Sequence, residues 1–201
     1  MTDYAARIIP EPVRILGLSL RPFSLGHYFL LKRWECSFVA EEKSTASRED
    51  LILGVLICSM DFEGFQEFMR RKDLESQIRL WGRKVGLFDF KEKSGLFEDY
   101  LKKGTEQPAY WIEDDNGDSA GGHWSQALLL TLLSLGFSRA EALNMPLTQA
   151  FADFYKHAES MGSVQLMTAE EERDLEIEET MAEAGAADGD RPRSGGGDCG
   201  A

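Results

Sequence analysis

Cysteine is scarce in this chain, which has three cysteines in 201 residues: Cys36, Cys58 and Cys199. The number is odd, and no two of them have the C-x-x-C spacing. Small domains that depend on disulfides are rich in paired cysteines, so this composition argues against a disulfide scaffold. It is typical instead of a protein that folds in a reducing compartment.

Long apolar runs are also missing. The longest, Leu51–Met60 and Ala127–Leu135, are about half of the ~20 residues that a membrane-spanning helix needs. Both are therefore predicted to be buried helices. Residues 1–12 contain two prolines and lack the apolar stretch of a signal peptide. We expect a cytoplasmic protein with no membrane partner.

Histidine is equally scarce, and no motif typical of catalysis or metal binding is present. The histidines are His27, His123 and His157. None is spaced with a second ligand as metal sites require, and the common nucleotide-binding, hydrolase and metalloprotease motifs are absent. The acidic stretch 114–118 begins like a calcium-binding loop, but Ser119 and Ser125 stand where that loop needs glycine and glutamate. We predict no catalytic residues, no metal and no cofactor, and hence a protein that is not an enzyme.

The two internal cysteines are expected to be unreactive. Cys58 lies in the most apolar segment, where a thiol acts as a small core residue. Cys36 follows Glu35, whose negative charge raises the pKa of the neighbouring thiol and disfavours the thiolate. Nucleophilic catalysis by cysteine is therefore not predicted.

Negative charge is in excess and unevenly placed. The net charge is −13, and residues 170–201 account for −8 of it, with 11 acidic residues and three arginines. An acidic protein repels the phosphate backbone at long range, so nucleic acid is not expected as a partner.

The composition and local patterns predict a mainly α fold. Apolar residues make up 43% of the chain and aromatic residues 10%, which is typical of a globular protein. Capping boxes, in which an N-terminal Ser or Thr pairs with an acidic residue three positions later, are predicted at Ser47–Asp50, Ser138–Glu141 and Thr168–Glu171. Ser24 is predicted to cap a further helix.

These signals divide the chain into four parts. They are an N-terminal lead-in over 1–12, a compact helical domain over 13–167, an acidic helix over 168–183 and a disordered tail over 184–201. Within the domain, residues 86–122 are predicted to form a loop-rich insertion with one short helix near Leu96–Lys102. At most a few short strands are expected, at Val13–Leu20 and Ser163–Met167.

Helices are predicted from the apolar periodicity over Leu25–Glu35, Arg48 to about Met60, Phe62–Trp81, Trp124–Leu135, Ser138–Asn144, and from Pro146 to Gly162. The helix that starts at Arg48 is apolar nearly all round, which predicts the central core helix. The helix that starts at Trp124 repeats Trp124, Leu128, Leu132 and Leu135 at helical spacing and ends at Gly136.

Two features leave alternatives open. The helices around the turn at Gly136–Pro146 could form a DNA-binding helix-turn-helix, but the second offers one acidic and one basic residue and no arginine, so a helical hairpin is favoured. The basic clusters at Arg70–Lys72 and Arg79–Lys84 could meet an acidic partner or the Glu-rich C-terminal helix, or form a solvated face.

Two segments resemble known proteins. One runs from Leu20 to His27 (LRPFSLGH) and continues with Asp50–Ser59 (DLILGVLICS). The other runs from Leu135 to Leu147 (LGFSRAEALNMPL) and continues to Glu159–Gly162 (ESMG). Together they are similar to small proteins encoded among the tail genes of tailed bacteriophages and prophages, most like the tail assembly chaperones. The resemblance covers roughly residues 13–60 and 124–170.

The resemblance implies a non-catalytic phage tail assembly chaperone, which binds the long helical tape-measure protein during tail morphogenesis in the host cell cytoplasm. It implies no site residues, because the motifs that carry it are apolar and positional. The alternative is a virion structural component, such as a tail-completion or connector protein. A small enzyme with an unfamiliar site in residues 86–122 is a third hypothesis.

Overall fold

The computed structural model describes residues 12–40, 45–71, 74–86, 88–112 and 123–168, together with positions 170–171, 173–175, 177 and 181. The chain forms two compact units, one over Asp3–Leu166 and a smaller one made of Met167–Ala201 with Met1–Thr2. The predicted lead-in up to Glu11, the acidic stretch 114–118 and the predicted tail over 184–201 lie outside the described residues.

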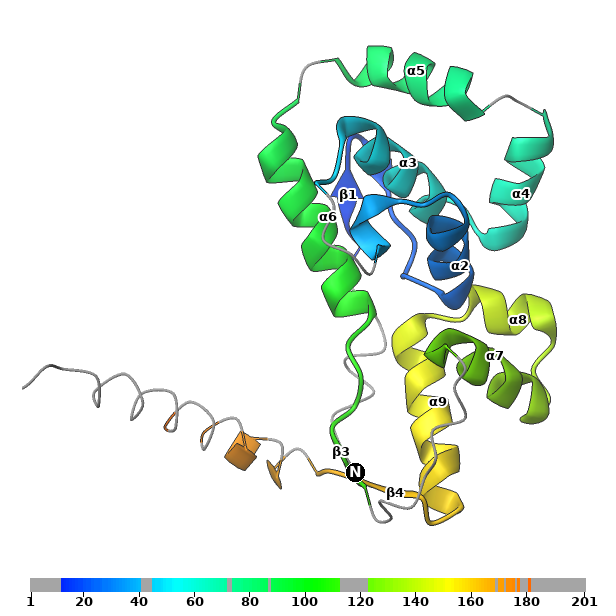
Figure 1. The fold of residues 1–201 in the computed structure, drawn as a ribbon, viewed down its shortest axis with the longest axis vertical. Coiled ribbons are helices and arrows are strands. Elements are labelled where there is room, and N and C mark those ends of the chain that lie inside the picture. Colours follow the sequence, from blue (N-terminus) through cyan, green and yellow to red (C-terminus); the bar gives the residue numbers. More distant parts are fainter. Residues whose placement is uncertain are drawn as a thin grey trace, which may run out of the picture. The chain divides into compact units, whose positions relative to one another are not determined.

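The unit Asp3–Leu166 is mainly helical, as predicted (Figure 1). Its helices are α2 (Leu25–Arg33), the 3-10 helix η1 (Ser37–Val39), α3 (Arg48–Cys58), α4 (Phe62–Arg71), α5 (Leu74–Val85), α6 (Phe90–Gly104), α7 (Trp124–Ser134), α8 (Arg139–Asn144) and α9 (Leu147–Ser160). Its short strands are β1 (Arg14–Ile15), β2 (Leu18–Ser19), β3 (Tyr110–Ile112) and β4 (Val164–Leu166). In the part of the chain that is described, no helix has the length and apolarity to cross a membrane.

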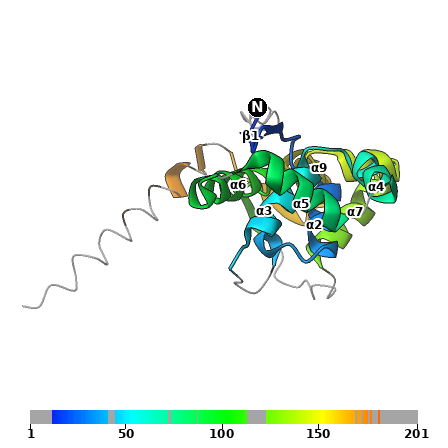
Figure 2. The ribbon, with the colours of Figure 1, turned by 90° about the horizontal axis from the view of Figure 1, so that it is seen from above.

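Helix α3 is the centre of the core. Every residue from Leu51 to Cys58 is buried, which confirms the prediction from its apolar sequence. Helices α2, α5 and α6 and the η1 turn pack against it, and the view from above shows α5 lying over α2 and α3 (Figure 2). A helix buried on all sides needs apolar residues on all sides, and this one has them.

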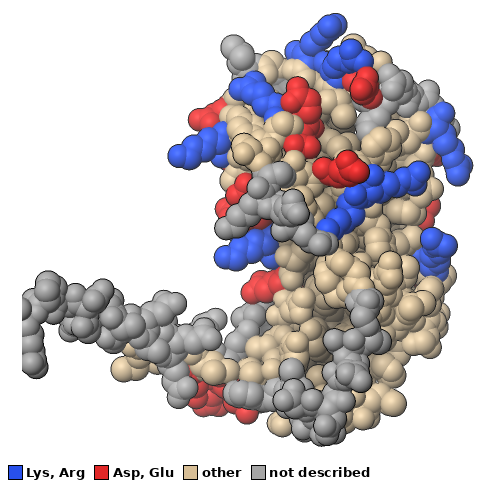
Figure 3. All heavy atoms as spheres, viewed as in Figure 1, with Lys and Arg blue, Asp and Glu red and all other residues tan. Residues whose placement is uncertain are grey.

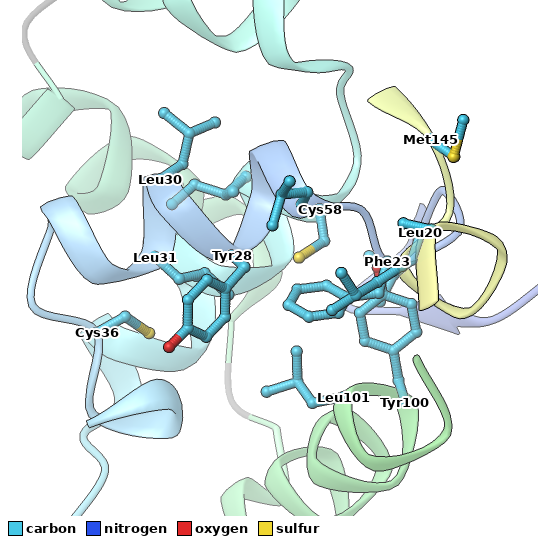
Figure 4. Packing of buried hydrophobic residues seen from close by; sticks show 14 of the residues in the cluster. Leu20, Phe23, Tyr28, Leu30, Leu31, Cys36, Cys58, Tyr100, Leu101 and Met145 are labelled. Atoms are coloured by element: carbon cyan, nitrogen blue, oxygen red, sulfur yellow. The ribbon is translucent and has the colours of Figure 1, made fainter. Parts of the chain in front are cut away.

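The aromatic part of the core joins α6 to the segment before α2 (Figure 4). The rings of Phe23 and Tyr100 meet edge to face at 5.9 Å, and Phe97 stacks on Tyr100 at 5.7 Å. The buried Tyr100 hydroxyl donates to the Arg21 carbonyl at 2.8 Å. A buried hydroxyl without an acceptor would be destabilising, so this bond fixes where α6 lies along the core.

The prediction of a loop-rich insertion over 86–122 is wrong for its first half, although the short helix predicted near Leu96–Lys102 is confirmed as part of a longer helix. Residues Phe90–Gly104 form the 15-residue helix α6, which Asp89 caps by accepting from the Glu92 N–H at 3.1 Å. Phe97, Tyr100 and Leu101 are buried and have the i, i+3, i+4 spacing of a helical face. Glu98 and Asp99 lie between them in the sequence and are exposed, and together with the lysines near both ends of the helix they obscure the pattern.

The predicted single helical stretch Phe62–Trp81 is also wrong, because the structure has two helices there, α4 and α5. One straight helix over residues 62–85 would be about 36 Å long at ~1.5 Å per residue. The break allows α4 to pack on α2 and α8 while α5 packs on α3. Phe65 in the first helix and Ile78 in the second thus both reach the core.

The predicted strand Val13–Leu20 is a β-hairpin. Strands β1 and β2 pair antiparallel, with Arg14 opposite Ser19 and Ile15 opposite Leu18. The turn residues Leu16 and Gly17 have φ values of 50° and 79°. Positive φ at both central positions is typical of the tight turns that match the twist of a hairpin. The predicted strand at Ser163–Met167 is confirmed as β4, which pairs with β3.

All three predicted capping boxes are present. Ser47, Ser138 and Thr168 each accept from the backbone N–H three residues later, at 3.1, 3.3 and 3.3 Å. In return, the carboxylates of Asp50, Glu141 and Glu171 accept from the backbone N–H of the capping residue. Beyond Thr168, the described residues of the acidic segment are helical, with Ile177 and Met181 exposed.

His27 completes a fourth box, at the start of α2. The Ser24 N–H donates to His27 Nδ1 at 3.1 Å, so the ring proton is on Nε2, which donates to the Met60 carbonyl at 2.7 Å. The ring thereby links the start of α2 to the α3–α4 connection. Burial lowers the pKa of His27 from 6.5 to about 4, although the bond to Met60 opposes that shift.

Acid should therefore destabilise the protein through His27. Between pH 6.5 and about 4 the unfolded chain binds a proton at this ring and the folded chain does not. The contribution of the neutral His27 ring to the free energy of unfolding is present above pH 6.5 and is lost as the pH falls. For a pKa difference of this size, the total loss is about 3 kcal/mol. Urea unfolding of the wild type should show a loss of about 2 kcal/mol between pH 7 and pH 5 beyond that of His27→Gln. Equal losses in the two proteins would contradict this assignment.

The close packing of α3 against α6 requires a glycine at position 54. A Cβ there would lie 2.7 Å from the Phe97 ring. Gly54→Ala should destabilise by roughly 1–3 kcal/mol, because the ring of a core residue must move. The matched control is Gly95→Ala in α6, where a Cβ has no heavy atom within 4 Å and should stabilise the helix by about 0.5–1 kcal/mol. Urea unfolding at pH 7 measures both, and changes of the same sign would show that Gly54 is not constrained.

Candidate protein-binding surface

Helix α7 and the residues beside it carry no charge. No Asp, Glu, Lys or Arg occurs from His123 to Ser138, although 28% of the chain is charged. In Figure 3 the charged side chains gather over the α4–α6 half of the visible face, and few are visible over α7 and α9, although α9 itself carries Asp153, Lys156 and Glu159. A surface helix without charge is uncommon, because solvated faces are normally rich in charged residues.

Both sides of α7 are apolar, and only one of them faces the core. Leu128 and Leu132 are 1% and 0% exposed, as the predicted periodicity requires, whereas Trp124 and Leu135 at the two ends are partly exposed. Leu130 is 66% exposed and Leu133 38% exposed. Clustered exposed leucines of this kind mark surfaces that contact another protein.

The exposed side forms a stripe along the helix. Gln126, Leu129, Leu130 and Leu133 have the i, i+3, i+4, i+7 spacing of one helical face. Leu129 is half-buried, and the other three are exposed. We call these four residues the α7 stripe. It is uncharged from end to end.

Aromatic contacts hold the N-terminal end of α7 in place. Trp124 lies between Tyr28 of α2 and Phe151 of α9, with ring centroids 4.7 and 5.4 Å away. His123 caps the helix by accepting from the Ser125 N–H at 3.3 Å, and its Nε2 lies 3.2 Å from the Tyr28 hydroxyl. The stripe is thus presented by a helix that α2 and α9 position.

A pocket of about 310 Å³ adjoins the stripe. Four helices line it, α2, α4, α7 and α8, which Figure 1 shows next to one another. Its lining residues are Phe29, Leu30, Arg33, Phe62, Gln126, Leu129, Arg139 and Leu143. We call it the four-helix pocket. Gln126 and Leu129 belong to both the pocket and the α7 stripe, so the two form one continuous surface.

Close approach and hydrogen bonds hold the helices around the pocket together. A Cβ at Gly26 would lie 2.6 Å from the Leu143 carbonyl oxygen, so only glycine allows α2 to lie this close to α8. The Asn144 side chain accepts from the Phe62 N–H at 3.0 Å and donates to Glu63 at 2.7 Å. These contacts join α4 to α8.

The structure does not bring the histidines together into a site. His27 and His123 cap helices, and His157 is half-buried on α9. Within the described ranges, no group of three His, Cys, Asp or Glu side chains could hold a metal ion.

Both internal cysteines are buried. Burial raises the pKa of Cys36 to about 11 and also raises that of Cys58. The direction for Cys36 agrees with the prediction, but its main cause is burial, with a smaller contribution from Asp50 and none identified from Glu35.

Among the described residues, the second helix of the helix-turn-helix alternative and one arginine of the basic clusters make contacts within the fold. Helix α9 buries Leu147, Phe151 and Tyr155, and it packs on α7 and β4 as a structural helix. In the basic clusters, Arg79 pairs with Glu75 of its own helix at 3.1 Å.

Comparison with known proteins finds no similarity: no protein-family model matches the chain, and neither a curated protein nor a solved structure does so.

The two sides of α7 provide a direct test of this surface. Leu130→Gln should change the free energy of unfolding by less than about 0.5 kcal/mol, because the side chain is already exposed. Leu132→Gln, two residues away in the same helix, should cost several kcal/mol, because it removes core contacts and buries an amide. Urea unfolding of both variants checks this, and similar losses would mean that Leu130 is part of the core.

Proposed function

We propose that this chain is a non-catalytic phage tail assembly chaperone that binds helical segments of a tape-measure-like protein during tail morphogenesis. The α7 stripe is the observation that carries the proposal. An uncharged row of exposed leucines beside an apolar pocket suits an amphipathic helix, which binds through apolar side chains at i, i+3, i+4 and i+7. No catalytic or cofactor-binding group is part of the proposal.

The resemblance to phage tail proteins proposed from the sequence points to the same part of the molecule. It covers residues 13–60 and 124–170, which contain α2, α3, α7, α8 and α9. Seven of the eight residues that line the four-helix pocket fall in these two ranges, Phe62 being the exception. The segments that resemble tail gene products are therefore those that build the candidate surface.

The alternative function, a virion structural component, is favoured by the same exposed leucines. Permanent interfaces are more apolar than transient ones, and a tail-completion or connector protein would bury this face in the finished particle. The two functions differ in the fate of the protein, because a chaperone leaves the particle and a component stays in it.

Co-expression with a tape-measure-like protein encoded in the same tail gene cluster tests the proposal. We expect the partner to aggregate when made alone and to form a complex with the wild-type chain. The complex should persist at about 0.5 M salt, since salt screens charge pairs and leaves apolar contacts intact. The double variant Leu130→Gln, Leu133→Gln should remain folded and lose the complex.

The matched control is Leu80→Gln, because Leu80 is a 50% exposed leucine on α5, outside the α7 stripe and the four-helix pocket. It should leave the complex intact. A partner that is soluble alone and ignores the chain would contradict the proposal. Mass spectrometry of finished particles distinguishes the two functions. A full stoichiometric amount of the chain in the particles would establish that it is a structural component.

A further inference from the structure

The four-helix pocket combines apolar walls with two arginines. Phe29, Leu30, Phe62, Leu129 and Leu143 supply the apolar lining, and the charged lining residues, Arg33 and Arg139, are both positive. Arg33 is the last residue of α2, and Arg139 is the first residue of α8. Residues far apart in the sequence thus place two guanidinium groups at one apolar pocket.

Neither arginine has an ion-pair partner among the residues that the structure describes. Other arginines of the chain do: Arg21 pairs with Asp61 at 3.0 Å and Arg79 with Glu75 at 3.1 Å. A guanidinium group binds a carboxylate through two parallel hydrogen bonds, which gives this pair both strength and direction. The two arginines of the pocket are therefore available to carboxylates of another molecule.

The surroundings of the pocket favour a helix over a small molecule. A volume of about 310 Å³ is at the small end of the range for small-molecule sites, which is roughly 300–1,000 Å³. The apolar surface continues beyond the pocket to Leu130 and Leu133 of the α7 stripe. A small ligand inside the pocket would leave that stripe exposed, whereas a helix laid along the stripe covers both.

We infer that the four-helix pocket and the α7 stripe together bind an amphipathic helix of another protein whose apolar stripe is flanked by acidic residues. The apolar side chains lie on the α7 stripe and in the pocket. The flanking carboxylates pair with Arg33 and Arg139. This inference rests on the proposed function and specifies the chemistry of the helical segment that is bound.

The net charge of the chain makes a preference for an acidic helix over a basic one unexpected. At −13, the protein as a whole attracts basic peptides and repels acidic ones. A preference for an acidic helix therefore has to come from a local site. The sign of the preference alone separates binding at the two arginines from general electrostatic attraction.

Two designed helical peptides of equal length test the inference. Both carry leucines at i, i+3, i+4 and i+7, and they differ only in the residues that flank this stripe, glutamate in one and lysine in the other. Fluorescence anisotropy of the labelled peptides with the full chain gives both affinities. At low salt the glutamate peptide should bind about tenfold more tightly, and the ratio should shrink at 0.5 M salt.

Charge reversal identifies the residues responsible. The double variant Arg33→Glu, Arg139→Glu should reverse the preference, while Arg79→Glu on α5 lowers the net charge by half as much and should keep it. Circular dichroism confirms that each variant is folded. Tighter binding of the lysine peptide to the wild type, binding of neither peptide, or an unchanged preference in the double variant would each overturn the inference.

These outcomes are separable from the proposed function. If the tape-measure-like protein forms a complex that depends on Leu130 and Leu133 while the peptides show no preference for glutamate, the inference fails and the proposed function stands. If the glutamate preference is found and that partner is ignored, the site binds acidic helices of a different protein, and the proposed function fails.

Discussion

The burial of α3 on every side is the constraint on which the rest of the structure depends. Residues Leu51–Cys58 are covered in all directions, so the chain must supply apolar neighbours around the whole helix. Helices α2, α5 and α6 and the η1 turn provide them. Gly54 brings the Phe97 ring against the helix backbone, and the Tyr100 hydroxyl reaches the Arg21 carbonyl. Burial of this extent is the main favourable term in folding.

A second set of contacts attaches the α7–α9 region to this core. The Leu147 N–H donates to the Phe23 carbonyl at 2.7 Å, and Gly26 lets α2 approach α8 closely. His27 ties the start of α2 to Met60 just before α4. Across the described residues, no buried polar side-chain atom lacks a hydrogen-bond partner. The candidate surface is therefore carried by a region whose polar groups are satisfied, and its exposed leucines are a feature of a well-packed fold.

Local sequence signals predicted most of the secondary structure. They were wrong where charged residues interrupt an apolar pattern or where a turn is poorly marked. Capping boxes were found correctly because they depend on hydrogen bonds between residues three positions apart, such as Ser138 and Glu141. Helix α6 is longer than the predicted short helix near Leu96–Lys102, because Glu98 and Asp99 interrupt the apolar residues Phe97, Tyr100 and Leu101. The sequence predicts one strand where the structure has the hairpin at Leu16–Gly17, because the turn has only one glycine to mark it.

Some features of the candidate site also follow from the sequence, and others only from the tertiary structure. The sequence by itself determined that α3 is central, since a helix that is apolar on all sides is stable in water only when it is covered. It also showed that residues 123–138 are uncharged. The periodicity of Leu128 and Leu132 predicted the side of α7 that faces the core, but the exposure of the remaining leucines was decided by the tertiary structure. Leu129 and Leu130 are the same residue type in the same helix, and only the packing of α7 in the fold leaves one half-buried and the other exposed. The pocket likewise exists only in the fold, because its walls come from residues as distant as Phe29 and Leu143, and no local pattern can bring such residues together.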